Sequence, residues 1–119
     1  MIFSSVMHKS FLLVLLLSVA AGCTNRHMTS AIDSWKDQPI KDVISAWGQP
    51  SEELRVSGKH LYIWNNFDGI LIPSDKTRPP ILPETEYCTR LLEVDKNDIV
   101  ISGNWDGTDC PGFFSGWGR

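Results

Sequence analysis

The stretch YCTRLLEVDKNDIVISGNW, from Tyr87 to Trp105, decides the fold. Two runs with apolar residues at alternating positions flank a polar centre, which predicts a β-hairpin. If Lys96 and Asn97 form its tip, opposite side chains share one face, and that face is almost wholly apolar. The pairs expected on this face are Val94 with Ile99, Leu92 with Ile101, Arg90 with Gly103, and Cys88 with Trp105. A slip of one residue would bring Val100 and Ser102 to the same face, so the pattern favours the first register.

A helix is predicted from Pro39 to Trp47, ahead of the strands. Proline suits the first turn of a helix, and Gly48 follows as a stop signal. Four apolar residues repeat at the spacing i, i+3, i+4 and i+7, so they share one helical face. They are Ile40, Val43, Ile44 and Trp47. A shorter helical turn through Trp35, capped by Thr29 or Ser30, is expected before this helix.

A second hairpin is expected over residues 53–67, with a glycine in its turn. Successive side chains of a strand point to opposite faces, so Leu61 and Ile63 lie on one face of the sheet. Tyr62 and Trp64 lie on the other face. Either both faces are covered, or the aromatic face is exposed for a partner. Tyr62 and Trp64 are therefore candidate partner-binding residues.

The connection from Asp68 to Glu86 holds four of the chain's seven prolines. Proline cannot donate a ladder hydrogen bond, so we expect a long loop here. The whole pattern predicts an α+β fold with two short N-terminal helices packed on one face of a three- to four-stranded antiparallel sheet. Residues 31–119 are expected to form one small domain, because a chain of 119 residues suffices for a single core.

Residues 1–22 have the order of a secretory signal peptide. A start with Lys9 and no acid precedes the uncharged run FLLVLLLSVAA, from Phe11 to Ala21, and small residues follow. The run is about 11 residues long, whereas a membrane-spanning helix needs about 20. We therefore expect this segment to be removed rather than to span a membrane.

The residues Ala20-Ala21-Gly22-Cys23 resemble the lipobox of bacterial lipoproteins. In that family the signal is cut before the cysteine, the thiol receives a diacylglycerol, and the new N-terminus is acylated, commonly with palmitate. The resemblance implies lipidation at Cys23 and a membrane anchor of two or three acyl chains, which is enough for stable attachment. An ordinary secretory signal, with Cys23 as a spare thiol, is the alternative.

Thr24 follows the cysteine. In Gram-negative lipoproteins an aspartate at this position commonly retains the protein in the inner membrane. The resemblance therefore implies sorting to the outer membrane, on its periplasmic side. Residues 23–30 are short and polar, which predicts a lipidated tether between the membrane and the fold.

Three cysteines in an exported protein leave one over. Lipid on Cys23 leaves Cys88 and Cys110, and a disulfide between them is expected in an oxidising compartment. Two free buried thiols are the alternative. A zinc site is not expected, because neither cysteine has a further cysteine or histidine at ligand spacing.

The helix ending in Trp47-Gly48-Gln49-Pro50, the strand with Tyr62 and Trp64, and the final hairpin resemble the small outer-membrane lipoproteins of the SmpA/OmlA type. The resemblance covers about Ser30 to Trp105. That family has two helices on a three-stranded antiparallel sheet and assists the insertion of β-barrel proteins, so the resemblance implies an accessory role in barrel assembly. The proline-rich connection and the cysteine pair depart from the family's pattern. Uncharacterised lipoproteins of the same fold are the alternative.

We expect no enzymatic activity, cofactor or metal. The chain has no G-x-S-x-G, H-E-x-x-H or phosphate-binding glycine loop. His60, the one histidine in the body of the chain, lies beside a glycine turn and is expected to be an exposed strand residue. A net charge of −3 with scattered basic residues argues against nucleic acid as a partner.

The tail CPGFFSGWGR, from Cys110 to Arg119, is rich in aromatic residues. Phe113, Phe114 and Trp117 either fold onto the sheet or form an exposed element that meets a partner or lipid. With the anchor, these features predict a non-enzymatic, lipid-anchored periplasmic protein that binds another envelope protein. The alternatives are a structural or protective envelope lipoprotein without a dedicated partner and a glycan-binding module.

Overall fold

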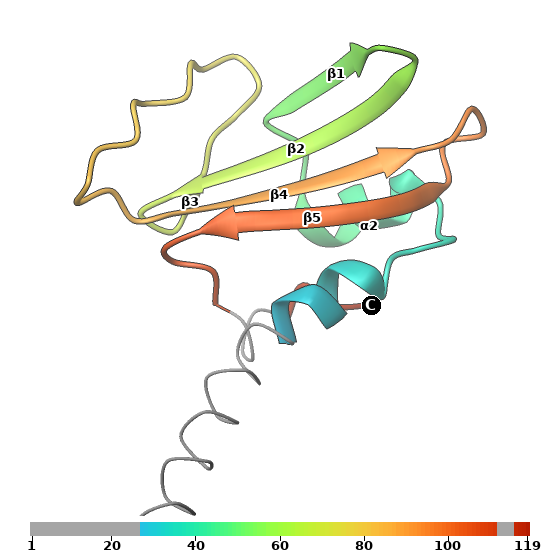
Figure 1. The fold of residues 1–119 in the computed structure, drawn as a ribbon, viewed down its shortest axis with the longest axis horizontal. Coiled ribbons are helices and arrows are strands. Elements are labelled where there is room, and N and C mark those ends of the chain that lie inside the picture. The colour runs from blue at the N-terminus through green and yellow to red at the C-terminus, as the bar shows by residue number, and fades with distance from the viewer. Residues whose placement is uncertain (1–26, 112–115) are drawn as a thin grey trace, which may run out of the picture.

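The computed structural model describes residues 27–111 and 116–119 and has a mixed α+β fold (Figure 1). The elements are helical residues 27–33, α2 (Ile40–Trp47), β1 (Glu52–Val56), β2 (Lys59–Phe67), β3 (Ile70–Leu71), β4 (Tyr87–Val94) and β5 (Val100–Gly107). The strands form one antiparallel sheet in the order β1-β2-β4-β5, and β3 is a further partner of β2.

The α+β class is as predicted, but the sheet has five strands instead of three or four. The additional strand is β3, in which two residues of the expected long loop pair with the end of β2. So short a strand has no periodicity that the sequence could reveal.

Helix α2 forms where the sequence predicts it. It begins after Pro39 and ends at Gly48, whose N–H donates to the carbonyl oxygen of Ile44 at 2.8 Å. Gly48 has a φ of 88°, a left-handed value that glycine adopts without steric cost. The buried residues of the helix are Ile40, Val43 and Trp47. The apolar face predicted from the spacing therefore packs into the core.

Helical residues 27–33 include residues 27–30, which we had assigned to the tether. Met28 is only 1% exposed and belongs to the core with Ile32 and Trp35. Met28 and Ile32 are one helical turn apart, so their side chains share the buried face. The folded part of the chain therefore includes residues 27–30.

The hairpin of β4 and β5 forms, but its register differs from the predicted one. The pairs on its core face are Cys88 with Gly107, Arg90 with Trp105, Leu92 with Gly103, and Val94 with Val100. A register shift beside Glu93 separates the last pair from the others. It turns Val100 into the core at 1% exposure and leaves Ile101 40% exposed. The four pairs that we predicted are therefore wrong.

The turn between β4 and β5 explains this difference. The Asp95 carboxylate accepts hydrogen bonds from the backbone N–H groups of Asn97 and Ile99, at 2.8 and 3.0 Å. Beyond this longer turn, the backbone of Val100 pairs with residues 37–38 through bonds of 2.9 and 2.8 Å. The connection between the two helical segments thus selects Val100 as the inward-facing residue.

Both helical segments pack on one face of the sheet, which we call the covered face. The buried core comprises Met28, Ile32, Trp35, Ile40, Val43, Trp47, Tyr62, Trp64, Cys88, Leu92, Val94 and Val100. The approach is closest at Gly103 in β5, where an added Cβ would lie 2.4 Å from Cγ2 of Ile32 and 2.6 Å from Cδ2 of Leu92. Neither helical segment lies on the opposite face, which we call the open face.

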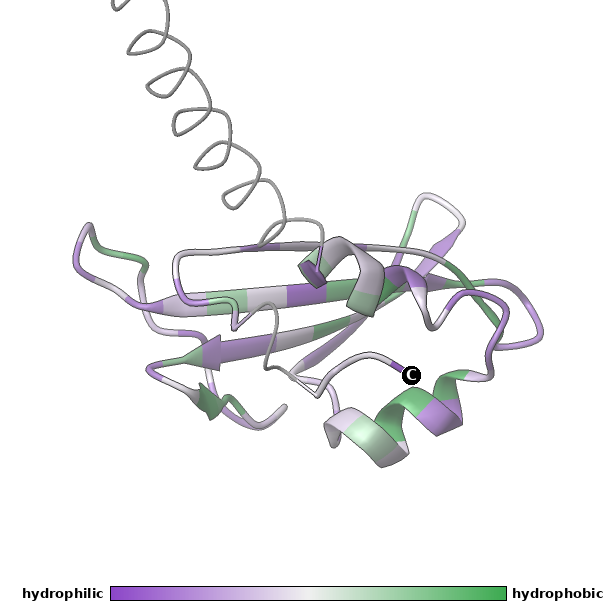
Figure 2. Ribbon diagram, turned by 90° about the horizontal axis from the view of Figure 1, so that it is seen from below, coloured by the Kyte–Doolittle hydropathy of each residue, from purple (hydrophilic) through white to green (hydrophobic). Residues whose placement is uncertain are grey.

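The C-terminal residues lie between α2 and the sheet (Figure 2). The carbonyl oxygen of Trp117 accepts hydrogen bonds from the indole N–H groups of Trp35 and Trp47, at 2.6 and 2.9 Å. Of the two arrangements that the sequence left open for the tail, Trp117 adopts the one that packs on the sheet.

Candidate functional site

Three of the residues singled out in the sequence, Cys23, Phe113 and Phe114, lie outside the described residues. The predicted disulfide between Cys88 and Cys110 is present and joins positions that are 22 apart. Cys88 is buried in β4, and Cys110 packs against the core from the chain that follows β5. The disulfide therefore ties the start of the tail to the centre of the sheet.

Tyr62 and Trp64 lie in the core, at 8% and 0% exposure. The indole N–H of Trp64 donates to the carbonyl oxygen of Gly48 at 2.9 Å, and its ring meets that of Trp47 edge to face at 5.0 Å. The aromatic face of β2 is thus the covered face. Of the two arrangements that the sequence left open for this face, the covered one is present, so the candidate partner-binding residues Tyr62 and Trp64 lie in the core. A partner surface has to be sought elsewhere.

Arg90 is a notable residue that the sequence reasoning missed. It is 2% exposed, and its guanidinium carbon lies 4.6 Å and 3.7 Å from the ring centroids of Trp47 and Trp117. Its Nη2 donates to Oδ1 of Asn66 at 2.7 Å. Nε and Nη1 have no hydrogen-bond partner in the part of the chain that the structure describes. The sequence signal was a single arginine at an inward position of an apolar strand.

Burial lowers the pKa of Arg90 to about 10. The side chain therefore remains a cation at neutral pH, even though desolvation disfavours the charged form. The two indole rings compensate for part of that cost, since a cation is attracted to the face of an aromatic ring.

The open face of the sheet carries a group of aliphatic side chains. Opposite residues of neighbouring strands share a face, so the pairing places Leu54 beside Leu61, and Ile63 beside Leu91. We call these four residues the aliphatic patch. Leu54 is 39% exposed, and Val56, at 52%, extends the patch along β1. Leu61, Ile63 and Leu91 are half-buried. Exposed apolar surface such as that of Leu54 and Val56 is typical of interaction sites.

Acidic residues border the aliphatic patch. The strand pairing places Glu52 and Glu93 on the open face next to it, with Lys59 at one end. The Glu52 carboxylate accepts a long hydrogen bond, 3.4 Å, from Nδ2 of Asn65, whose Oδ1 accepts one of 3.0 Å from the Thr89 hydroxyl. The border is therefore mainly anionic, which suits a partner with basic residues around an apolar centre.

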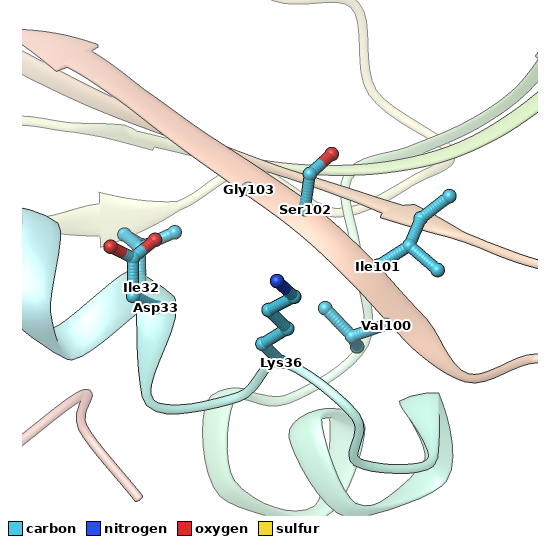
Figure 3. Close-up of a pocket in the computed structure, with 7 residues that line it drawn as sticks. All are labelled: Ile32, Asp33, Lys36, Val100, Ile101, Ser102 and Gly103. Atoms are coloured by element: carbon cyan, nitrogen blue, oxygen red, sulfur yellow. The ribbon is translucent and has the colours of Figure 1, made fainter.

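A cleft of about 280 Å³ lies where helical residues 27–33 and the following turn meet β5 (Figure 3). Its lining is Ile32, Asp33, Lys36, Val100, Ile101, Ser102 and Gly103, with the Lys36 side chain directed toward β5. The strand β5 is at the edge of the sheet, and an edge strand offers backbone groups for pairing. The cleft combines one acid, one base and an apolar wall, an arrangement that suits contact with another chain.

His60 is buried instead of exposed, which corrects our expectation for it. Its Nε2 lies 2.6 Å from Oε1 of Glu53, and its Nδ1 lies 3.7 Å from Oδ1 of Asp98. The hydrogen bond from His60 lowers the pKa of Glu53, while burial, followed by the Glu53 charge, raises the pKa of Tyr62. This histidine therefore links β1 to the turn between β4 and β5. Over residues 27–111 and 116–119, no group of three or more His, Cys, Asp or Glu is placed to hold a metal.

No family model, curated protein or solved structure matches this chain. Among the described residues, no helix is long and apolar enough to cross a membrane. A function for the protein therefore rests on the motif at Cys23 and on the geometry of the open face.

Proposed function

We propose that this protein is a lipoprotein anchored to the periplasmic side of a Gram-negative outer membrane, where it binds another envelope protein and catalyses no reaction. The lipobox-like residues Ala20-Ala21-Gly22-Cys23, which follow a signal-like segment, support the anchor. The disulfide between Cys88 and Cys110 fits an oxidising compartment. An anchor keeps the domain near the membrane and so raises its effective concentration toward other envelope proteins.

The observation that carries the binding function is the aliphatic patch on the open face. Its residues lie on paired strands, which hold their side chains in fixed positions, and not on a loop. Glu52 and Glu93 border it, so the partner we propose has an apolar surface with basic residues at its rim. Complementary charge at the rim speeds encounter and selects the partner.

An accessory role in the insertion of β-barrel proteins is the specific form of this proposal. The resemblance to lipoproteins of the SmpA/OmlA type supports it, as do two short helices placed ahead of an antiparallel sheet. The glycan-binding alternative needs exposed tryptophans, whereas the five tryptophans are buried or only partly exposed. The remaining alternative is a structural lipoprotein without a dedicated partner, and experiment must distinguish it from a partner-binding protein.

The anchor is tested by feeding cells an alkyne-tagged fatty acid and fractionating their membranes. Wild-type protein should carry the label and sediment with the outer membrane. Cys23→Ser should lose both the label and the membrane association. Equal labelling of the two proteins would contradict lipidation at Cys23.

Partner binding is tested by retention of envelope proteins on the anchored chain. Leu54→Lys places a positive charge in the patch and should reduce retention about tenfold, which corresponds to about 1.4 kcal/mol. Lys41→Glu, on the exposed side of α2, is the matched control and should retain the partner. Equal retention by both variants would place the binding surface outside the patch, and no protein retained on the wild type would favour the structural lipoprotein.

A further inference from the structure

The guanidinium of Arg90 is a buried cation with incomplete hydrogen bonding. One of its three nitrogens, Nη2, donates to Asn66, while Nε and Nη1 find no acceptor in the described part of the chain. A buried donor without an acceptor costs about 1–3 kcal/mol, and more when it is charged. The rings of Trp47 and Trp117 lie against the guanidinium. An aromatic face attracts the positive charge, but it does not supply acceptors for the N–H groups in the plane of the guanidinium. This side chain is therefore incompletely satisfied by the chain that surrounds it.

A cavity of about 210 Å³ is lined by residues that surround this group, although Arg90 itself does not line it. Its lining includes Asn66, which accepts the Arg90 hydrogen bond, and Trp117, whose ring covers the guanidinium at 3.7 Å. Cys88, two residues before Arg90 on the same strand, lines it as well. At about 30 Å³ for each water in the liquid, this volume suits a group of several heavy atoms.

We propose that Arg90 is the anchor of a carboxylate-binding site in this cavity, closed by the ring of Trp117. A carboxylate has two acceptor oxygens in a plane, the geometry that a guanidinium pairs with best. Its two oxygens would pair with one edge of the guanidinium, which is formed by Nη2 and either Nε or Nη1, so one of the two unpaired groups would gain an acceptor. Binding would need a shift of the Trp117 side chain. The site lies on the covered side of β4, so it is separate from the aliphatic patch and does not depend on the proposed function.

Asp109 also lines the cavity and sets the affinity of the site. Its negative charge disfavours a second carboxylate, so the wild-type site is expected to be weak. Removal of that charge should therefore strengthen binding, which is the reverse of what a structural role for Asp109 would produce. This opposite response makes Asp109 the diagnostic position.

The test uses isotope-labelled full-length protein in detergent, with sodium acetate exchanged for sodium chloride at fixed ionic strength. The Arg90 Nε–H and Trp117 indole resonances should shift and saturate in the wild type. Asp109→Asn should lower the apparent Kd about fivefold, the effect of about 1 kcal/mol between charges at 4 Å in water. Arg90→Met should show no saturable shift of the Trp117 resonance.

Two further probes identify the source of the carboxylate. A short acetylated peptide with a free carboxyl end is compared with its amidated twin. Tighter binding of the free peptide than of acetate assigns the site to a peptide end, and equal binding assigns it to small organic acids. Linear, unsaturable shifts in the wild type would overturn the proposal, as would an unchanged Kd in Asp109→Asn. These two readouts stand even if Arg90→Met fails to fold.

Discussion

The indole nitrogen of Trp35 lies 2.6 Å from the carbonyl oxygen of Trp117, a residue 82 positions later in the chain. Trp47 donates to the same oxygen at 2.9 Å, so one carbonyl joins the turn after the first helical segment, α2 and the C-terminal tail. Arg119 adds a backbone hydrogen bond of 2.8 Å to the hydroxyl of Ser34. Residues 116–119 are therefore a part of the fold and seal the covered face.

Substitution of Trp117 tests this sealing role. Trp117→Ala removes the ring that lies over Arg90 and should lower the free energy of unfolding by about 1–3 kcal/mol, less than a fully buried tryptophan would cost. Arg119→Ala is the control, because Arg119 bonds through its backbone; it should stay within about 0.5 kcal/mol of the wild type. Denaturant unfolding measures both, and equal stability of the two variants would show that the tail is not docked.

Loss of the disulfide should weaken the domain strongly. Its two cysteines are 22 positions apart, and closing a loop of that size stabilises by about 3 kcal/mol in the chain-entropy account. The double variant Cys88→Ala with Cys110→Ala should lose about this much, and reduction of the wild type should have a similar effect. Labelling of Cys88 without reductant would contradict the bond.

Gly103 is predicted to tolerate no side chain. A Cβ at this position would lie 2.4 Å from Cγ2 of Ile32 and 2.6 Å from Cδ2 of Leu92, so Gly103→Ala should cost about 1–3 kcal/mol through overpacking. Ser102→Ala, at an exposed position on the same strand, should change stability by less than about 0.5 kcal/mol. If thermal unfolding shows the same stability for the two variants, the close approach of helical residues 27–33 to β5 is absent.

The hydrogen bond between Glu53 and His60 should make stability depend on pH. Because this bond lowers the pKa of Glu53 below its ordinary value of 4.5, its contribution is present above pH 4.5 and is lost as pH falls through the lowered folded-state pKa. Glu53→Gln should therefore be less stable than the wild type at neutral pH, by less than about 1 kcal/mol for a half-exposed carboxylate.

The same difference should shrink as the solution is made strongly acidic, because the wild-type carboxylate then becomes protonated too. Urea unfolding at a series of pH values measures it, with Glu84→Gln, in the exposed loop, as the control for the loss of one acid. A difference that grows toward low pH would contradict this account.

Local signals in the sequence were enough for several elements. The i, i+3, i+4, i+7 spacing located α2 and its buried face, because a helix of this kind is specified by residues within two turns of each other. The count of cysteines gave the pairing of Cys88 with Cys110. Alternation along β2 separated Leu61 and Ile63 from Tyr62 and Trp64, and this separation holds in the sheet.

Features that depend on distant contacts were not readable in the same way. Which face of β2 is covered depends on where the helical segments dock. Alternation alone therefore could not decide whether Tyr62 and Trp64 are buried or exposed. The register near Val100 depends on its pairing with residues 37–38, which a hairpin considered by itself does not contain. Arg90 was missed because an arginine at an inward strand position ordinarily reaches solvent, whereas Trp117 closes over this one.

The central claim, that the open face binds a partner in the cell envelope, is tested most directly by site-specific photocrosslinking in living cells. A photoreactive amino acid is placed at Leu54 in the aliphatic patch or at Val56, which extends it, and at Lys41 on α2 as the control. The account predicts discrete crosslinked species from Leu54 and Val56, none from Lys41, and loss of those species when Cys23 is replaced by serine. Absence of crosslinks at Leu54 and Val56, or the same species at Lys41, would contradict it.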